Sequence, residues 1–413
     1  MKFAHMADLH LGATSDPALR KLEMETLERA LDRSVEEGAD FLIIAGDIFH
    51  VNIPDLAVVR DSVRVFRKFV ETGRKIYVVY GSHDFSPNAA SIVDILDEAG
   101  VFIRVGKPSS VNGMLRPEVV KDDRTGAILT GISGRRASLE KKAFEGLDRE
   151  YLSSLEGFKI FVFHTGLDEV RKENERYEGI ASSDLPLGFD YYAGGHIHRR
   201  IEFTRGMKAF YPGPLFTGWG ADMEATVKGE KRGFYIVEAD GGVKARFVEL
   251  TAFKGIYEEL DAKGLSATVA NEKLKALAQK LDVKDRVAVV KVFGELASGK
   301  TSEVDFASFR DSLMGKGAIY LHLNRNQLRA REIAAVTVSG EETSEIEEKV
   351  LKELAGTVRA KDPQLSANTV RLAKDLLAQL RVPKKEGETE ADYDARVSGA
   401  AKEVLGIKKL VEG

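Results

Sequence analysis

The chain contains no cysteine among its 413 residues. A disulfide-bonded scaffold is therefore excluded, and so is a zinc ribbon, which needs cysteine thiolates. No apolar run approaches the roughly 18 residues that cross a bilayer. Residues 2–7 begin a strand pattern in place of the apolar segment of a signal peptide. We therefore expect a soluble, cytoplasmic protein that spans no membrane.

An excess of charge of either sign is also missing. Lysine and arginine number 61 against 65 aspartates and glutamates, which gives a formal net charge of −4. This balance argues against a protein that coats DNA passively, because phosphate contacts need many cations. It leaves a nuclease possible, since local basic strips or a partner can contact the phosphates. The chain is longer than the length beyond which a single hydrophobic core stops growing, so two or three domains are expected.

Six of the eight histidines lie in five short segments, together with three aspartates. In chain order the segments are A-D-L-H (Asp8, His10), A-G-D-I-F-H (Asp47, His50), Y-G-S-H-D (Ser82, His83, Asp84), F-H-T-G (His164) and G-G-H-I-H (His196, His198). Taken singly, an aspartate can cap a turn, and alternating histidines can be surface residues. Together the five segments predict a metal site. His5 and His322 fit no such pattern and are expected to pack or to lie at an edge.

Each segment follows a short apolar run that is typical of a buried strand. These runs are residues 2–7, 41–45, 76–80, 160–163 and 189–193. Apolar residues at helical spacing separate the first three runs, over residues 24–35 before Gly38 and 59–70 before Gly73. In such a fold the ligands should gather beyond the carboxyl edge of a single sheet.

Hydrolysis by two metals needs a carboxylate that bridges cations about 3.5–4 Å apart, with further ligands to complete each shell. We choose Asp47 as this bridge. The mixed nitrogen and oxygen set suits manganese, iron or zinc better than calcium, which prefers oxygen ligands alone.

The five segments resemble those of the calcineurin-like metallophosphoesterases. Within that family they are similar to the SbcD-type nuclease subunit of the nuclease–ATPase complex that repairs DNA double-strand breaks. His50, three residues after Asp47, and the layout after residue 250 favour this subgroup. The resemblance covers residues 1–250 by motif and the remainder by layout. It implies an α/β fold, a two-sheet metallophosphoesterase sandwich flanked by helices, with a small α+β cap domain and a helical C-terminal tail.

The resemblance also implies two divalent metal ions, with manganese expected, and two catalytic histidines. The first metal would be held by Asp8, His10, Asp47 and His198, and the second by Asp47, Ser82, His164 and His196. His83 would contact the scissile phosphate or its leaving oxygen, and His50 would position the nucleic acid or assist His83. Alternatively, His83 only donates an outer hydrogen bond and transfers no proton.

Ser82 departs from the family pattern, which usually has asparagine at this position. A serine hydroxyl is shorter than an amide carbonyl, so it would coordinate weakly or hold a water that does so. We therefore expect weaker occupancy of the second metal without loss of activity. Asp84 either orients a ligand from outside the metal shell or caps the turn at Pro87.

Three regions are expected: a metallophosphoesterase (nuclease) domain over residues 1–250, an α+β capping domain over 251–330 and a helical partner-binding region over 341–413. The first should close with strands at 233–238 and 244–250. The second should run strand, helix (266–281), strand (286–293), helix (306–313) and strand (318–323). By resemblance it would help to choose between DNA ends, and a purely structural role is the alternative.

The C-terminal region has narrow apolar stripes typical of helices that dock on a partner. Ser344 and Glu347 have capping-box spacing, and two further stripes fall within residues 370–380 and 393–404. The resemblance implies that this region binds the coiled coil of an ABC-type ATPase. Packing on its own chain is the alternative.

Three functions remain open. The leading one is a manganese-dependent DNA exonuclease and endonuclease of double-strand-break repair, acting as a homodimer with two ATPase subunits. Residues 55–72 are the candidate dimer surface. The second is another metallophosphoesterase acting on phosphoproteins or small phosphodiesters, against which His50 and the long C-terminal extension weigh. The third is an architectural subunit whose chemistry is reduced by Ser82.

Overall fold

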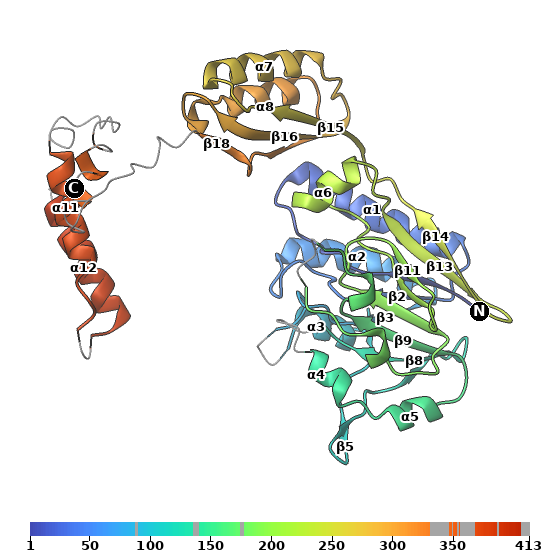
Figure 1. The fold of residues 1–413 in the computed structure, drawn as a ribbon. Helices are drawn as coiled ribbons and strands as arrows, with labels where there is room; N and C mark the ends of the chain where they lie inside the picture. Colours follow the sequence, from blue (N-terminus) through green and yellow to red (C-terminus); the bar gives the residue numbers. More distant parts are fainter. Residues whose placement is uncertain are drawn as a thin grey trace. The chain divides into compact units, whose positions relative to one another are not determined.

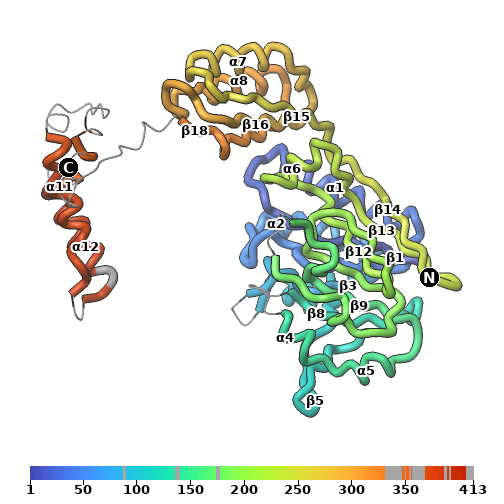
Figure 2. The backbone as a smooth tube through the Cα atoms, viewed as in Figure 1, coloured from blue at the N-terminus to red at the C-terminus, as the bar shows by residue number. Residues whose placement is uncertain are grey.

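The structure is a computed structural model of the chain. It describes residues 1–86, 90–134, 140–173 and 177–330, and, further on, 347–348, 350–352, 355, 368–385 and 388–405. The chain divides into two compact units, Met1–Ala330 and Arg331–Gly413 (Figures 1 and 2). Ser344 and Pro87 lie outside the described residues. In the described part of the chain, no helix is long and apolar enough to cross a membrane.

The first sheet of the larger unit has the strand order β14-β13-β1-β2-β3-β4. Its strands are β1 (Lys2–Met6), β2 (Phe41–Ala45), β3 (Lys75–Val79), β4 (Ile103–Arg104), β13 (Gly233–Ala239) and β14 (Val243–Glu249). Strands β1 to β4 run parallel, as expected for strands joined by helices. Strand β13 returns antiparallel beside β1, with Lys2 opposite Glu238.

Three helices cover the outer face of this sheet: α1 (Pro17–Glu36), α2 (Leu56–Val70) and α3 (Ile92–Glu98). Helix α1 begins where the Asp16 carboxylate accepts hydrogen bonds from the backbone of the first turn, with Pro17 at a position where a missing N–H costs nothing. Leu27 of α1, Phe66 of α2 and Leu42 of the sheet share one buried cluster. These helices therefore hold the loops that follow the strands in place.

The second sheet has the order β11-β12-β10-β9-β8-β7. Its strands are β7 (Val120–Lys121), β8 (Ile128–Ile132), β9 (Lys159–His164), β10 (Tyr191–Gly195), β11 (Ile201–Phe203) and β12 (Ala209–Tyr211). The inner strands are parallel, and β7 and β11 pair antiparallel at the two edges. Short elements surround this sheet: β5 (Ser110–Val111), β6 (Met114–Leu115), α4 (Glu140–Glu145), α5 (Arg149–Ser154) and the 3₁₀ turns η2 (Asp168–Val170) and η3 (Ser182–Asp184).

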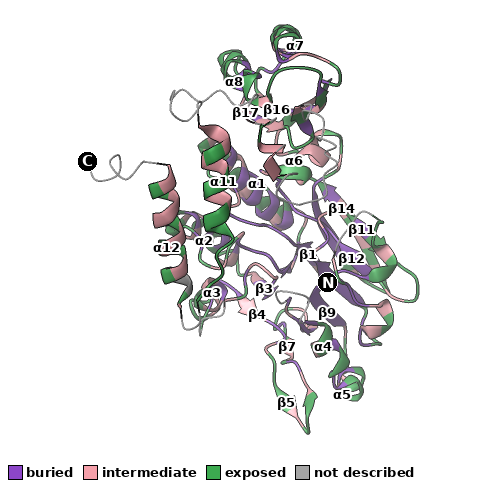
Figure 3. Ribbon diagram, turned by 60° about the vertical axis from the view of Figure 1, so that its left-hand side comes forward, coloured by how far each residue is buried: buried purple, intermediate pink, exposed green. Residues whose placement is uncertain are grey.

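Aromatic rings fill the space between the two sheets. Phe3 stacks on Phe41 at 5.1 Å between centroids, Tyr191 stacks on Phe210 at 5.1 Å, and Phe3 meets Tyr191 edge-on at 5.2 Å. His5 is fully buried in this layer and its Nδ1 lies 2.9 Å from the Tyr191 hydroxyl. The expected two-sheet sandwich flanked by helices is thus confirmed, and His5 is a packing residue. Figure 3 shows both sheets as buried layers.

A third sheet is formed by β15 (Lys254–Asp261), β16 (Arg286–Leu296), β17 (Tyr320–Asn324) and β18 (Leu328–Ala330). All of its described strand pairs are parallel, and α7 (Ala267–Lys280) and α8 (Phe306–Gly315) share a core with one of its faces, with η4 (Thr301–Glu303) between β16 and α8. On another side of this sheet, α6 (Gly220–Val227) packs Met223 against Val287 and Val289 of β16. The alternation of strands and helices matches the order expected from sequence.

The smaller unit contains α11 (Thr369–Leu380) and α12 (Glu390–Val404), which pack against each other. Both apolar stripes expected at residues 370–380 and 393–404 fall on these helices. None of the described residues in this unit is buried (Figure 3).

Candidate metal centre

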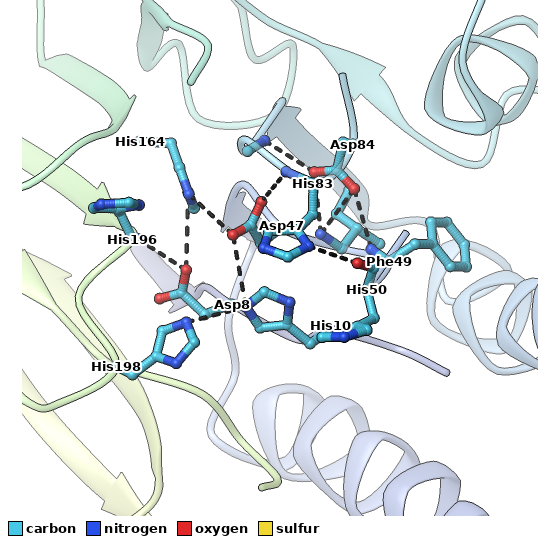
Figure 4. Close-up of polar contacts among 12 residues, drawn as sticks. Asp8, His10, Asp47, Phe49, His50, His83, Asp84, His164, His196 and His198 are labelled. Carbon is cyan, nitrogen blue, oxygen red and sulfur yellow. Dashed lines mark hydrogen bonds and ion pairs between the residues drawn. The ribbon is translucent and has the colours of Figure 1, made fainter. Parts of the chain in front are cut away.

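All five sequence segments come together in one place (Figure 4). Asp8 and His10 follow β1, Asp47 and His50 follow β2, and Ser82, His83 and Asp84 follow β3 of the first sheet. His164 ends β9, and His196 and His198 follow β10 of the second sheet. The expectation of a single sheet edge was wrong: the side chains meet where the carboxyl edges of two sheets face each other, because β9 and β10 belong to the second sheet.

The backbone is strained at four of the expected ligands. Asp8, His10, Asp47 and His196 have φ angles of 53°, 46°, 50° and 91°. Two other non-glycine residues in the described part of the chain have positive φ. Such conformations cost of order 1–3 kcal/mol each and persist where the surroundings impose them, often at functional sites. The backbone strain therefore indicates that the conformation at these loop positions is set by the direction that their side chains must take.

One group of ligand atoms involves His10, His198 and Asp8, whose candidate atoms lie within 4.8 Å of one another. The two Nε2 atoms of His10 and His198 face each other at 3.0 Å, and His10 Nε2 lies 3.6 Å from Asp47 Oδ2. Two imidazole nitrogens and a carboxylate oxygen that converge in this way can share one cation. These are residues expected to hold the first metal.

A second group involves Asp8, Asp47 and His164, again within 4.8 Å. His164 Nε2 lies 3.2 Å from Asp47 Oδ2. The other ring nitrogen, Nδ1, donates to the Ala45 carbonyl at 2.8 Å, and this bond leaves Nε2 to act as a ligand. Asp47 thus takes part in contacts with both His10 and His164, as a bridging carboxylate would.

Burial and charge make this centre receptive to a cation. Among the described residues, Asp8 Oδ2 is a buried oxygen with no hydrogen-bond partner. Burial raises the pKa of Asp8. Burial opposes a charged imidazole at His164, but the carboxylates of Asp47 and Asp8 raise the pKa of His164 to about 10. The buried acids thus draw positive charge to the position between them, which is the demand that a divalent cation would meet.

His196 and Ser82 are placed differently from the other expected ligands. The His196 ring lies 5.3 Å from the His164 ring between centroids, and its backbone N–H donates to Asp8 Oδ1 at 2.8 Å. Burial, followed by the neighbouring His164, lowers the pKa of His196 to about 4. Ser82 is half-buried in the turn after β3. Both remain predicted ligands.

His50 and His83 form a third group with His10. The His83 and His50 rings stack with 5.2 Å between their centroids, and His83 Nδ1 lies 2.5 Å from the His50 carbonyl oxygen. If that nitrogen donates to the carbonyl, His83 Nε2 is left for another partner. Burial lowers the pKa of His50, and His83 adds to this shift.

Asp84 joins two of the loops that carry the centre. Its carboxylate accepts from the backbone N–H groups of Ile48 and Phe49, each at 3.1 Å, and of Gly81 at 2.9 Å. It therefore clamps the loop that carries Asp47, which is close to the expected role of orienting a ligand. Gly81 is needed here, because a Cβ at this position would lie 2.0 Å from Asp47 Oδ1.

The sequence did not reveal three side chains that surround the centre. Asp222 of α6 lies with Oδ2 2.6 Å from His198 Nδ1. Trp219 packs its ring against His10 at 5.4 Å between centroids. Arg232 is 4% exposed and donates to the His198 carbonyl at 2.5 Å. None of the three stands in a metal-ligand motif, so no sequence signal could have singled them out.

Comparison with known proteins agrees with this site. Residues 1–200 match the family model of the calcineurin-like phosphoesterases. The chain therefore carries a calcineurin-like metallophosphoesterase domain, the family expected from the five segments.

Relatives described as DNA double-strand break repair protein Mre11 occur in several archaea. The protein of Methanopyrus kandleri is 29% identical over 60% of this chain and 57% of its own length. That of Archaeoglobus fulgidus is 26% identical over 68% of this chain and 64% of its own length. That of Thermoplasma acidophilum is 25% identical over 76% and 82%. The chain thus spans less than two thirds of the first two of these relatives.

Proposed function

We propose that the chain is a metal-dependent phosphodiester hydrolase that cleaves DNA in double-strand-break repair, as an exonuclease and endonuclease. One observation carries this proposal: buried acids and imidazoles from two sheets converge in overlapping groups on strained backbone. A structural role would not need so many unpaired polar groups in one buried place. The relatives named for DNA repair support DNA as the substrate.

Two divalent cations, proposed to be manganese, fit this donor set. The first would be held by Asp8, His10, Asp47 and His198, and the second by Asp47, Ser82, His164 and His196. When bound, such cations supply a nucleophile from water at neutral pH and neutralise charge on the phosphoryl oxygens.

The residues of the chain position these groups and move the proton. His83 N–H donates to Asp47 Oδ1 at 2.8 Å, so the other carboxylate oxygen of Asp47 faces His10 and His164. His83, held through Nδ1 by the His50 carbonyl, would present Nε2 to the substrate and give a proton to the departing sugar oxygen. His50, stacked on His83, would keep that ring in place.

The regions outside the centre have proposed roles as well. Residues 1–250 would form the nuclease domain, 251–330 the cap that helps to select DNA ends, and 341–413 the region that binds the coiled coil of an ABC-type ATPase. The lack of buried residues in the described part of the smaller unit supports a partner surface, since Leu380 is 57% exposed. Leu56, the first residue of α2, is 81% exposed and supports a homodimer contact on that helix, and Ile53, just before the helix, is 72% exposed.

The decisive experiment offers the purified chain three substrates with manganese or with chelator. These are labelled linear duplex DNA, single-stranded DNA and a small phosphodiester. We expect manganese-dependent cleavage of DNA that chelator abolishes. Cleavage of the small ester alone would favour a different phosphoesterase, and no turnover on any substrate would favour an architectural subunit.

A further inference from the structure

Helix α6 holds a carboxylate against a proposed metal ligand. Asp222 Oδ2 lies 2.6 Å from His198 Nδ1. A neutral imidazole that donates from Nδ1 to a carboxylate presents a lone pair at Nε2, and this contact also fixes the plane of the ring. Nε2 of His198 is the atom that faces His10 Nε2 at 3.0 Å. The contact with Asp222 therefore sets both the tautomer of His198 and the direction in which its Nε2 points.

A buried arginine braces this pair. Arg232, 4% exposed, donates from Nη1 to the His198 carbonyl at 2.5 Å and from Nη2 to the Asp222 carbonyl at 3.2 Å. Its Nε donates to the Thr226 hydroxyl of α6 at 2.8 Å. One planar guanidinium thus ties the loop that carries His198 to both ends of the helical turn that carries Asp222. Relative movement of the loop and the helix would break these bonds together.

The same helix is fastened to the third sheet. Glu224 accepts from the Tyr257 hydroxyl of β15 at 3.1 Å and from Asn324 Nδ2 of β17 at 3.1 Å. Met223, between the two acids, is fully buried against Val287 and Val289 of β16. Successive acids on α6 therefore face two structures: Asp222 contacts the metal centre, and Glu224 contacts the third sheet.

The residue that begins α6 contacts two more histidines. Trp219, at the N-cap, lies 5.4 Å from the His10 ring and 5.5 Å from the His50 ring between centroids. It is the only tryptophan in the chain. Helix α6 and its cap thus contact two proposed ligands of the first metal, His198 through Asp222 and His10 through Trp219.

We propose that Asp222 is a positioning residue for the first metal, and that the third sheet fixes its position through Glu224 of the same helix. This proposal rests on the proposed function, because it requires a cation bound by His198. It gives residues 254–324 a part in assembling the centre, in addition to any contact with DNA. The cap would then be needed even for hydrolysis of a substrate too small to reach it.

The test measures Mn²⁺ binding to the full chain by isothermal titration calorimetry, with electron paramagnetic resonance to count bound ions. Asp222→Ala should weaken Mn²⁺ binding at the first site, which is expected to be the tighter of the two, by about 10- to 100-fold. This is the usual effect of removing a residue that holds a metal ligand in place. Asp222→Asn keeps an acceptor oxygen and should recover part of that loss. Asp240→Asn, in the exposed turn between β13 and β14, removes the same charge and should bind manganese as the parent does.

A second variant tests the link to the third sheet. Glu224→Ala leaves Asp222 intact but removes the bonds to Tyr257 and Asn324, and should weaken Mn²⁺ binding at the same site by about 3- to 10-fold. Thermal unfolding of the metal-free proteins separates the alternatives. If Asp222→Ala lowers Tm yet binds manganese as tightly as the parent, Asp222 only anchors the helix and the proposal is wrong.

The failure of the proposed function would look different. If the parent chain itself binds no manganese, the proposed metal centre does not exist and the variants have no site to change. If the parent binds manganese and Glu224→Ala binds it equally well, the link to the third sheet is wrong even where the role of Asp222 holds.

Discussion

At the metal centre, Asp8, His10 and Asp47 are at most 2% exposed and all have positive φ, whereas no described residue of the unit containing α11 and α12 is buried. Polar groups in the first region are buried, and several lie on strained backbone. In the second, ion pairs such as Lys374 with Glu348 lie at the surface. Burial of polar groups without full pairing is costly, so the first region indicates a bound ion. Apolar stripes left in water indicate a surface for a partner.

The largest effect should come from the acid shared by both ligand groups. Asp47→Asn should lower manganese-dependent cleavage by about 10³-fold, because it removes a charge on which the whole electrostatic arrangement depends. Cleavage is measured with labelled duplex at saturating manganese. Asp240→Asn is the control and should cleave normally. A near-normal cleavage rate for Asp47→Asn would mean that this group of buried polar residues does not catalyse cleavage.

His83→Gln should slow DNA cleavage by about 10²-fold or more, since glutamine gives no proton to the leaving oxygen. A nitrophenyl phosphodiester, whose leaving group needs no proton, should lose much less activity. Rates on the two substrates are compared at one manganese concentration. Equal losses on both would support the alternative that His83 only donates an outer hydrogen bond.

The buried carboxyl group of Glu23 in α1 should make the free energy of unfolding depend on pH. Burial raises the pKa of Glu23 to about 7, above its ordinary value of 4.5. Between about pH 4.5 and 7, the Glu23 carboxyl group is ionised in the unfolded chain but still protonated in the folded chain. The free energy of unfolding therefore falls as the pH rises through this range, and it stays lower at higher pH. Glu23→Gln should therefore gain up to about 3 kcal/mol at pH 8 and nothing at pH 4.

Urea unfolding at several pH values measures this difference. Glu25→Gln, an exposed position on the same helix, is the matched control and should keep the pH dependence of the parent. An unchanged pH dependence in Glu23→Gln would mean that a buried acid in this unit behaves like the exposed acids of α12.

Ser82→Asn restores the amide usual in the family and should bind the second manganese more tightly, by about 10-fold, the lower end of effects around metal ligands. Calorimetric titration of the second site gives the value. A variant that binds the second ion no more tightly would contradict the expected role of position 82.

The smallest effect on stability is expected in the other region. Leu380→Asp, at a side chain 57% exposed, should change the free energy of unfolding by no more than about 0.5 kcal/mol. It should nevertheless weaken binding of the proposed ATPase coiled coil, measured by calorimetry or co-purification. A large loss of stability would mean instead that the stripe packs on its own chain.

The sequence could predict which side chains gather at the centre because they stand in local motifs, although their role as ligands stays a prediction. Strand β2 was predicted at its observed bounds, and β1 and β3 within one residue, since buried parallel strands are short apolar runs. The ligands follow those strands directly, so their position at a carboxyl edge could be inferred. The contacts of Asp47 Oδ2 with His10 and His164 agree with that inference.

What the sequence could not give depends on contacts between distant residues. Periodicity identifies strands but not their partners, so the division of the ligand strands between two sheets was missed. Asp222 lies 24 residues after His198 and acts through a single hydrogen bond, which leaves no pattern. The Asp84 clamp was only half inferred, because its three backbone donors lie on two separate loops.

The antiparallel pairing of β13 with β1 brings together residues at the two ends of the segment 2–239, with Lys2 opposite Glu238. The ribosome must therefore synthesise more than half of the chain before the earliest strand gains its second neighbour. Contacts so distant in sequence close slowly, and a partly made chain cannot form them. Strand β1, which leads directly to Asp8 and His10, thus stays unpaired on one side until synthesis has passed residue 238.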